Sequence, residues 1–492
     1  MQFVSKQIPC LQWVSSQVLN QEQTQEVRLD DSMPKIGRVL GAWGQVVLRG
    51  KEWRSGSVQV SGGVSVWVLY LPEEGGACQS VETWVPFQWK TDIPPGTRDG
   101  TLVASGLLRS VDARSLTPQK LMVRANVGLQ LQVLAPMQAT VYAPEEVPEH
   151  VQLRREQWQL RLPMEAGEKA FALDERLQLP AGSPRFERIL YYRLQPEIID
   201  RKVMADKVVF RGVGALQLVY LAENGRVCSA RLEVPFAQYG ELTGQYGEDA
   251  QTQILLSVTG LELRPEQEGD FLLTGGMTGQ YVIYEQQTQE LVTDAYSTRM
   301  TSVCQWEDLG MPEAQPQPAQ TLDCQVRIDE GALEPVDGVF WPEQPCKTRT
   351  DDGLCLEPVG RFQLLGYDRE GQLQVVSADW SGEPISMTQR SEVAVMPTGP
   401  VRVSLEGQDA VLRGQLLVDA VTLTEGERAS LAALELQEKT CQDAPSLILR
   451  RASGESLWEL AKATGSTENA IRAANGLEAE PEKDRMLLIP IV

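Results

Sequence analysis

Short runs in which Val, Leu, Tyr and Trp alternate with polar residues recur along most of the chain. Examples are 129–134, 254–258, 281–284 and 411–418, and such runs end at turns that contain glycine. Alternation with a period of two is typical of strands that bury one face. Many short strands joined by turns predict a mainly β fold with sandwich-like or barrel-like units.

The strand pattern repeats along the sequence. Tyr70 and Tyr220 occupy matching positions 150 residues apart, and the Val-Pro-Phe sequence at 85–87 recurs at 234–236. A weaker third copy covers 360–371 and lacks the Val-Pro-Phe sequence. A period of this length is too long for a solenoid repeat, so it predicts three tandem β-rich units.

Each copy contains a predicted β-hairpin. Asn224-Gly225 separates two apolar runs and is a strong hairpin signal. The residues at 73–76 and 369–371 occupy the equivalent turns. The segment 311–320 is rich in Pro and Gln, which predicts an extended linker, and 430–438 is rich in Ala, Leu and Glu, which predicts a short helix. The predicted boundaries are 1–145, 150–310 and 321–441 for the three units and 446–492 for a last, smaller domain.

The last segment, 446–492, has two stretches with helical spacing between two apolar runs. The predicted order is strand, helix, helix, strand, which makes this a small α+β (βααβ) module. Ser456 followed by Glu459 is a capping-box sequence, so the first helix is expected to begin at Leu457. Gly465 is expected to end that helix.

The second helix of this segment is expected to be capped by Ser466 or Thr467 and closed by Asn475-Gly476. An apolar run at 486–489, stopped by a proline, predicts the closing strand. Both helices present apolar positions at helical spacing. These predicted inner-face residues are Leu457, Leu460, Ala461 and Thr464 in the first helix and Ile471, Ala474 and Leu477 in the second.

Composition limits the classes of partner. The formal charge of −22 repels phosphate backbones and anionic lipids, so neither nucleic acid nor a membrane surface is an expected partner. No apolar run is long enough to cross a bilayer, and the first residues lack the pattern of a secretory signal. The eight cysteines are scattered without a C-x-x-C pair, which predicts reduced thiols and a cytoplasmic location.

The sequence offers little catalytic chemistry. His150 is the one histidine, and it lies at the joint between the first two predicted units, where an exposed side chain is expected. Cys346 and Cys355 are the closest cysteine pair but lack partners for zinc. Gly275–Gly279 is glycine-rich, lies between two apolar runs and predicts a turn rather than a phosphate loop. With 67 acidic residues, a glycosidase-like carboxylate pair cannot be recognised from the sequence. We therefore expect no enzyme, cofactor or metal, with a cell-wall hydrolase as an open alternative.

The first predicted unit is rich in tryptophan, a residue that serves both buried cores and exposed binding platforms. We expect core positions overall, with Trp84 and Trp89 half exposed because they flank Val-Pro-Phe. The five residues are Trp43, Trp53, Trp67, Trp84 and Trp89.

The strand–helix–helix–strand segment resembles a LysM module, a class of non-catalytic binders of N-acetylglucosamine polymers such as peptidoglycan. Three β units that end in one such module are similar to the clostridial SPOCS-domain sporulation proteins, and this resemblance covers essentially the full chain. It implies a non-enzymatic scaffold of the spore envelope in the mother-cell cytoplasm. Such a protein docks on the coat morphogenetic ATPase at the forespore surface, with the LysM module involved in that contact.

The ligand groove of LysM modules lies between the first strand–helix loop and the second helix–strand loop. The resemblance places eight candidate binding residues there: Gly454, Glu455, Ser456, Leu457, Trp458, Asn475, Gly476 and Leu477. Of these, Glu455, Trp458 and Asn475 are expected to recognise the partner. Capping by Ser456, turns at the glycines and core packing by the leucines are compatible structural roles. The partner is therefore expected to be either a coat protein or a peptidoglycan polymer, and the oligomeric state stays open.

Overall fold

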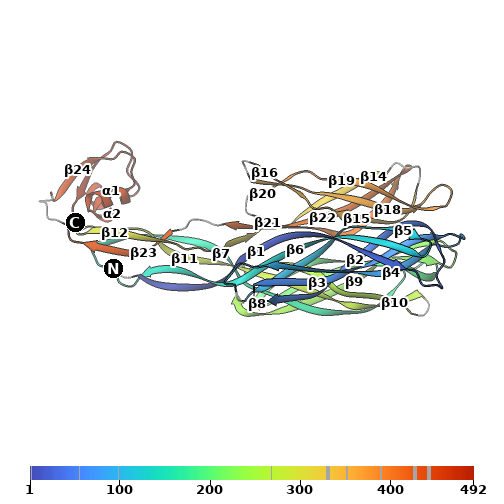
Figure 1. Ribbon diagram of the computed structural model, residues 1–492. Helices are drawn as coiled ribbons and strands as arrows, with labels where there is room; N and C mark the ends of the chain where they lie inside the picture. Colours follow the sequence, from blue (N-terminus) through green and yellow to red (C-terminus); the bar gives the residue numbers. More distant parts are fainter. Residues whose placement is uncertain are drawn as a thin grey trace.

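The computed structural model describes residues 1, 3–54, 56–97, 99–266, 269–328, 333–350, 353–387, 391–424, 429–439 and 445–492, without the side chains of 346, 347 and 350. These residues form 25 strands and two short helices, so the predicted mainly β class is confirmed (Figure 1). In the described part of the chain, neither helix has the length and hydropathy needed to cross a bilayer.

Two long antiparallel strand pairs run the length of the molecule. β1 (Phe3–Arg28) pairs with β6 (Lys120–Pro144), and β7 (Val151–Gln178) pairs with β11 (Asp270–Ser297). Their periodic burial reflects the alternation of apolar and polar residues along each strand.

A third long pair is built from shorter strands. β12 (Thr301–Asp308) pairs with β23 (Ala429–Gln437), whereas β13 (Glu313–Pro316) and β14 (Gln320–Ile328) both pair with β22 (Asp409–Thr424). In each long pair, one further strand pairs with the outer edge of a later long strand. These are β5 (Thr101–Thr117) on β6, β10 (Gln251–Pro265) on β11, and β21 (Ser391–Glu406) on β22.

Between the long strands of each pair, the chain forms a second sheet, which we call the inner sheet. β8 (Phe186–Ala222) bends back in its middle, near Ala205, whose φ is 46°, so that Gly212 lies against the Glu197 carbonyl of the same strand. The third set also contains a small extra sheet of β16 (Cys346–Thr350), β17 (Gly353–Glu357) and β20 (Ile385–Met387). The inner sheets are β2 (Ile36–Arg54), β3 (Ser57–Pro72) and β4 (Gln79–Asp92); β8 (Phe186–Ala222) and β9 (Val227–Tyr246); and β15 (Glu334–Pro342), β18 (Val359–Tyr367) and β19 (Leu373–Ser381).

The same pairing pattern thus occurs in three consecutive strand sets, β1–β6, β7–β11 and β12–β23. A local feature repeats with it. A Cβ atom at Gly62 would lie 2.3 Å from the Val47 carbonyl oxygen, and one at Gly212, 150 residues later, would lie 2.0 Å from that of Glu197. Only glycine permits so close an approach of two strands.

The three inner sheets contact one another in a closed ring: β4 touches β8, β9 touches β15, and β19 touches β2. Ser80 donates a hydrogen bond of 2.5 Å to the Leu190 carbonyl, and Ser229 donates one of 2.5 Å to that of Val336. Arg38 closes the ring with a 3.0 Å hydrogen bond to the carbonyl of Leu373. One apolar core runs through all three sets, so they do not form separate beads.

Beyond the inner sheets, the ends of the long strands continue as a narrower part that we call the stem. It consists of the paired ends of β1 and β6, of β7 and β11, and of β12 and β23 (Figure 1). Its own apolar clusters include Leu160 with Leu291 and Val292 with Leu431. The small C-terminal module lies at the end of the stem.

The predicted hairpin turns are confirmed, because Gly75, Gly225 and Gly371 have φ values of 81°, 78° and 73° between paired strands. The turn predicted at Gly275–Gly279 is wrong. These residues lie inside β11, which pairs with strands on both sides. Glycine is needed there because a Cβ at Gly275 would lie 2.2 Å from the Gly260 carbonyl oxygen.

Two further predictions need correction. The helix predicted at 430–438 is the strand β23, since pairing with β12 and burial of Leu431 and Leu434 override helix propensity. Part of the linker predicted at 311–320 belongs to a sheet, because the residues of β13, 313–316, pair with β22.

The tryptophans of the first strand set lie mainly in the core, as predicted. Trp43 is 1% exposed and Trp67 is 3% exposed. Trp89 is also buried, which contradicts its predicted half-exposure. Trp84 is half-buried beneath the Arg49 guanidinium, which lies 4.0 Å from the ring centroid.

Candidate functional site

The C-terminal module has the predicted order of elements. β24 (Leu447–Arg451) and β25 (Met486–Pro490) form an antiparallel pair, and α1 (Leu457–Thr464) and α2 (Glu468–Asn475) lie between them in sequence. The module buries a small core of Leu457, Leu460, Ala461, Ile471, Leu487 and Ile489. Ala474, predicted on the inner face, is exposed, and Leu477 is half-buried.

The predicted start and end of α1 are confirmed. The Glu459 backbone N–H donates to the Ser456 hydroxyl at 3.3 Å, and the Ser456 backbone N–H donates to the Glu459 carboxylate at 2.9 Å. This reciprocal pair is a capping box. Gly465 follows the helix with a φ of 74° and Gly454 precedes it with a φ of 105°, backbone conformations that favour glycine.

α2 is capped by Thr467, and Gly476 ends it with a φ of 57°. The Asn475 side chain joins this helix to the closing strand. Its amide nitrogen donates to the Ile471 and Leu488 carbonyls at 2.8 and 2.6 Å, and its oxygen accepts the Leu488 N–H at 2.8 Å. Asn475 therefore has a structural role within the module.

Glu455 is half-buried in the loop before α1. Its carboxylate accepts the Ser453 backbone N–H at 3.0 Å and the Ser453 hydroxyl, and it pairs with Arg450. These Ser453 hydrogen bonds, aided by Arg450, lower the pKa of the Glu455 carboxyl. The carboxylate is thus ionised and held in one position.

A side chain from the last loop spans the two loops of the predicted groove. The Glu480 carboxylate accepts the Leu457 backbone N–H at 2.8 Å and pairs with Arg472 at 3.3 Å. A ligand that enters between the Gly454–Leu457 loop and the Asn475–Leu477 loop must therefore displace Glu480 or bind beside it.

Trp458, predicted to recognise a partner, contacts the stem. Its indole N–H donates to the Asp294 carboxylate at 2.7 Å, and its ring packs edge-on against Tyr296 with centroids 4.9 Å apart. Only 8% of Trp458 is exposed. In this arrangement the indole ring packs against the stem and does not present a free face to a partner.

Two more interactions complete what we call the module–stem contact. The Lys462 ammonium lies 2.7 and 2.9 Å from the two Asp294 oxygens, and the Tyr296 hydroxyl donates to the Ser466 carbonyl at 3.0 Å. Burial alone would raise the pKa of Asp294. The hydrogen bonds from Lys462 and Trp458 outweigh that effect, so this pKa lies below its usual value.

The outer side of the β24–β25 pair exposes four large apolar side chains, which we call the ribbon face. Leu449 lies directly opposite Leu488, and the flanking positions on the same side hold Leu447 and Met486. Their exposed fractions are 63%, 41%, 51% and 51%, respectively. A small module that exposes this much apolar surface in one place has the chemistry of a protein-docking surface.

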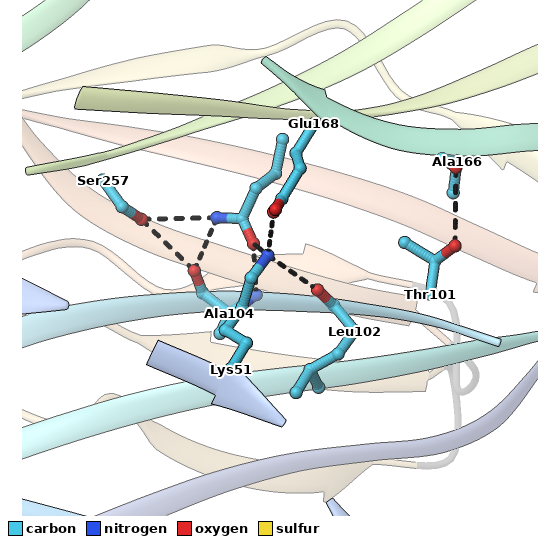
Figure 2. A network of polar contacts seen from close by, with 8 residues as sticks. Lys51, Thr101, Leu102, Ala104, Ala166, Glu168 and Ser257 are labelled. Carbon is cyan, nitrogen blue, oxygen red and sulfur yellow. Dashed lines mark hydrogen bonds and ion pairs between the residues drawn. The ribbon is translucent and has the colours of Figure 1, made fainter. Parts of the chain in front are cut away.

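A buried polar network joins the first two strand sets (Figure 2). The Lys51 ammonium donates to the Leu102 carbonyl at 3.0 Å and to the Gln280 side-chain oxygen at 2.7 Å, and it pairs with Glu168. The Ser257 hydroxyl donates to the Ala104 carbonyl at 3.2 Å rather than to a base, so the network holds strands together and lacks an activated nucleophile.

The remaining candidate chemistry is sparse. His150 is half-buried rather than exposed, and its backbone carbonyl accepts the Thr298 N–H at 2.8 Å. In the described part of the chain, no group of three or more His, Cys, Asp or Glu side chains is placed to hold a metal ion. The Cys346 side chain and Cys441 lie outside the described residues.

The chain matches no protein-family model, no curated protein and no solved structure.

Proposed function

We propose that this chain is a non-enzymatic assembly scaffold whose C-terminal module docks on a protein partner through the ribbon face. The observation that carries this proposal is the set of four exposed apolar side chains on one side of β24 and β25. Because the sequence resembles SPOCS-domain sporulation proteins, we propose that this scaffold belongs to the spore envelope. There the expected partner is the coat morphogenetic ATPase at the forespore surface.

Two features of the module favour a protein partner over a glycan. The loops of the expected sugar groove are bridged by Glu480, and the one tryptophan of the module packs on Tyr296 instead of offering a flat face to a sugar ring. No described residue covers the ribbon face in a comparable way, since Leu449 and Leu488 are both well exposed.

The test is the double variant Leu449→Glu and Leu488→Glu, which places charge at the centre of the ribbon face. We expect it to lose forespore localisation in sporulating cells and to lose binding to the purified ATPase. The matched control is Ile199→Glu, because Ile199 is 66% exposed on β8, outside the module. Normal localisation and binding of the double variant would contradict the proposal.

A titration of the full chain with chito-oligosaccharides tests the glycan alternative. Saturable binding that is unchanged in the ribbon-face variant and lost in Glu455→Ala would favour a peptidoglycan binder. Absence of binding, together with absence of cell-wall hydrolysis, agrees with the scaffold.

A further inference from the structure

A cavity lies where the strand sets meet, and we call it the axial cavity. Inner-sheet strands contribute Gln45 from β2, Gln195 from β8 and Val339 from β15, so all three sets line it. Its volume is about 220 Å³, several times the roughly 30 Å³ that one water molecule occupies in the liquid. The space is therefore large enough for a small organic molecule.

Three residues that line this cavity each carry a buried side-chain nitrogen with no hydrogen-bond partner among the described residues: Nε of Arg109, Nε of Arg193 and Nε2 of Gln195. Gln45, which lies 150 residues before Gln195, has hydrogen-bond partners for both polar atoms of its side chain. Its oxygen accepts the Leu194 N–H at 2.9 Å, and its nitrogen donates to the Val46 carbonyl at 3.2 Å. Buried donors are normally satisfied, so three unsatisfied donors on residues around one space indicate that polar partners are missing in this region.

The charged side chains that line the cavity are both cationic. Arg193 pairs with Asp337 at 3.0 Å, whereas Arg109 donates to the carbonyls of Pro342 and Glu343 at 3.2 and 2.6 Å and lies near the Glu343 carboxylate. No Asp or Glu occurs among the described residues that line the cavity, although the chain has 67 acidic residues. Burial lowers the pKa of Arg109 to about 10, so its guanidinium is still charged at neutral pH.

The remaining wall is largely apolar. Leu108, Leu256, Phe340 and Met396 contribute side chains from four different strands. A molecule that fills this space must therefore combine a hydrogen-bond-accepting, negatively charged group with an apolar portion. Water satisfies donors but does not neutralise a buried guanidinium.

We propose that the axial cavity binds a small oxyanion with an apolar body, held by Arg109, Arg193 and Gln195. A guanidinium presents parallel N–H donors that match a carboxylate or a phosphate group. The two head groups share this chemistry, and binding experiments with one probe of each kind distinguish them. Because the ligand lies where all three strand sets meet, its binding also stabilises the ring of inner sheets.

The experiment uses the purified full chain, dialysed extensively, with hexyl phosphate and hexanoate as probes in isothermal titration calorimetry. Native mass spectrometry of the undialysed protein looks for a small molecule retained from the cell. We expect one saturable site for at least one probe, with a higher unfolding temperature in its presence. Preference for hexanoate identifies a carboxylate site, and preference for hexyl phosphate identifies a phosphate site.

Two variants test the residues. Arg109→Gln removes one guanidinium charge from the cavity lining, and Gly128→Ala adds a Cβ that would lie 2.5 Å from Arg109 Nε and so displaces the guanidinium. Both should weaken binding by at least about tenfold, the effect of losing roughly one charged hydrogen bond. The control Arg38→Gln removes a guanidinium that also donates to a carbonyl of another strand set, at Leu373, but does not line the cavity.

The control should bind the probe within about twofold of the unchanged chain, a difference well below one hydrogen bond. Gly128→Ala keeps all charges, so it tests the site even where Arg109→Gln lowers stability. If neither probe binds saturably and no retained molecule is found, the axial cavity holds water only and the proposal is wrong. Equal affinity of the unchanged chain and both cavity variants also overturns it.

Discussion

At the residue scale, side chains that resemble recognition groups are used to hold the module together and in place. Asn475 joins α2 to β25, and Trp458 joins the module to Asp294 on β11. The capping of α1 by Ser456 was predictable, because both members of the capping box lie within four residues of sequence. The partner of Trp458 was not, because Asp294 lies 164 residues away and no local pattern identifies it.

The first prediction concerns Asp294 and pH. Its pKa is lower in the docked state than when free, so the module–stem contact is fully stable above the free pKa. That stability is lost as the pH falls through the lowered pKa, which means below about pH 4. The protection of the 457–464 amides against hydrogen exchange, relative to their intrinsic rates at the same pH, should therefore fall in acid while the β sheets are still protected.

At neutral pH, Asp294→Asn should accelerate the same exchange by weakening docking by about 1 kcal/mol, because the ion pair with Lys462 is partly exposed. Glu290→Gln is the control, since Glu290 lies on the same strand but pairs with Arg155 at the surface. Equal exchange in both variants would show that Asp294 does not hold the module.

The second prediction concerns Asn475. Asn475→Ala removes three hydrogen bonds to backbone groups of Ile471 and Leu488, so the module should lose about 1–2 kcal/mol of unfolding free energy. Asn469→Ala, at an exposed position on the same helix, is the control and should change stability little. Exchange rates of the β25 amides measure both, and an unchanged rate in Asn475→Ala would exclude the structural role.

At the element scale, long strands replace several of the shorter elements that the sequence predicts. Gly275–Gly279 resembles a turn because glycine clusters are common in turns, yet here each glycine admits a neighbouring strand or ring. The segment 430–438 has helix-forming composition, but β12 offers it a pairing partner more than a hundred residues away. Local propensity carries no information on such long-range pairing.

The third prediction concerns Gly279 in β11. A Cβ atom there would lie 2.6 Å from the Phe210 ring, so Gly279→Ala should cost about 1–3 kcal/mol through overpacking. The control is Gly260→Ala on the adjacent strand β10, where the nearest atom would lie 3.8 Å away. Urea unfolding followed by tryptophan fluorescence compares the two. A similar midpoint for both variants would show that the strand tolerates the side chain.

At the whole-molecule scale, the sequence predicts the repeat but not its closure into a ring. The matching positions of Tyr70 and Tyr220 are visible because the period is regular, and both hydroxyls donate to a proline carbonyl 36 residues earlier. The ring depends on contacts such as the stacking of Trp43 on Tyr191, with centroids 4.6 Å apart. Neither residue has a sequence neighbour that indicates the other.

The fourth prediction follows from the shared core. Because apolar packing is continuous through the three strand sets, calorimetry should show one cooperative transition for them and a separate, smaller one for the C-terminal module. Gln280→Ala, which removes the centre of the network in Figure 2, should lower the temperature of the whole main transition by several degrees. Three resolved transitions in the main part would contradict this expectation.

The long strands also set a length. β7 has 28 residues, and at about 3.3 Å per residue it extends over as much as roughly 90 Å. A partner bound at the ribbon face and another bound at the far end of the ring of inner sheets would be kept apart by this hydrogen-bonded spacer. In a layered shell built from many copies, the length of these strands would set a fixed distance between the layers.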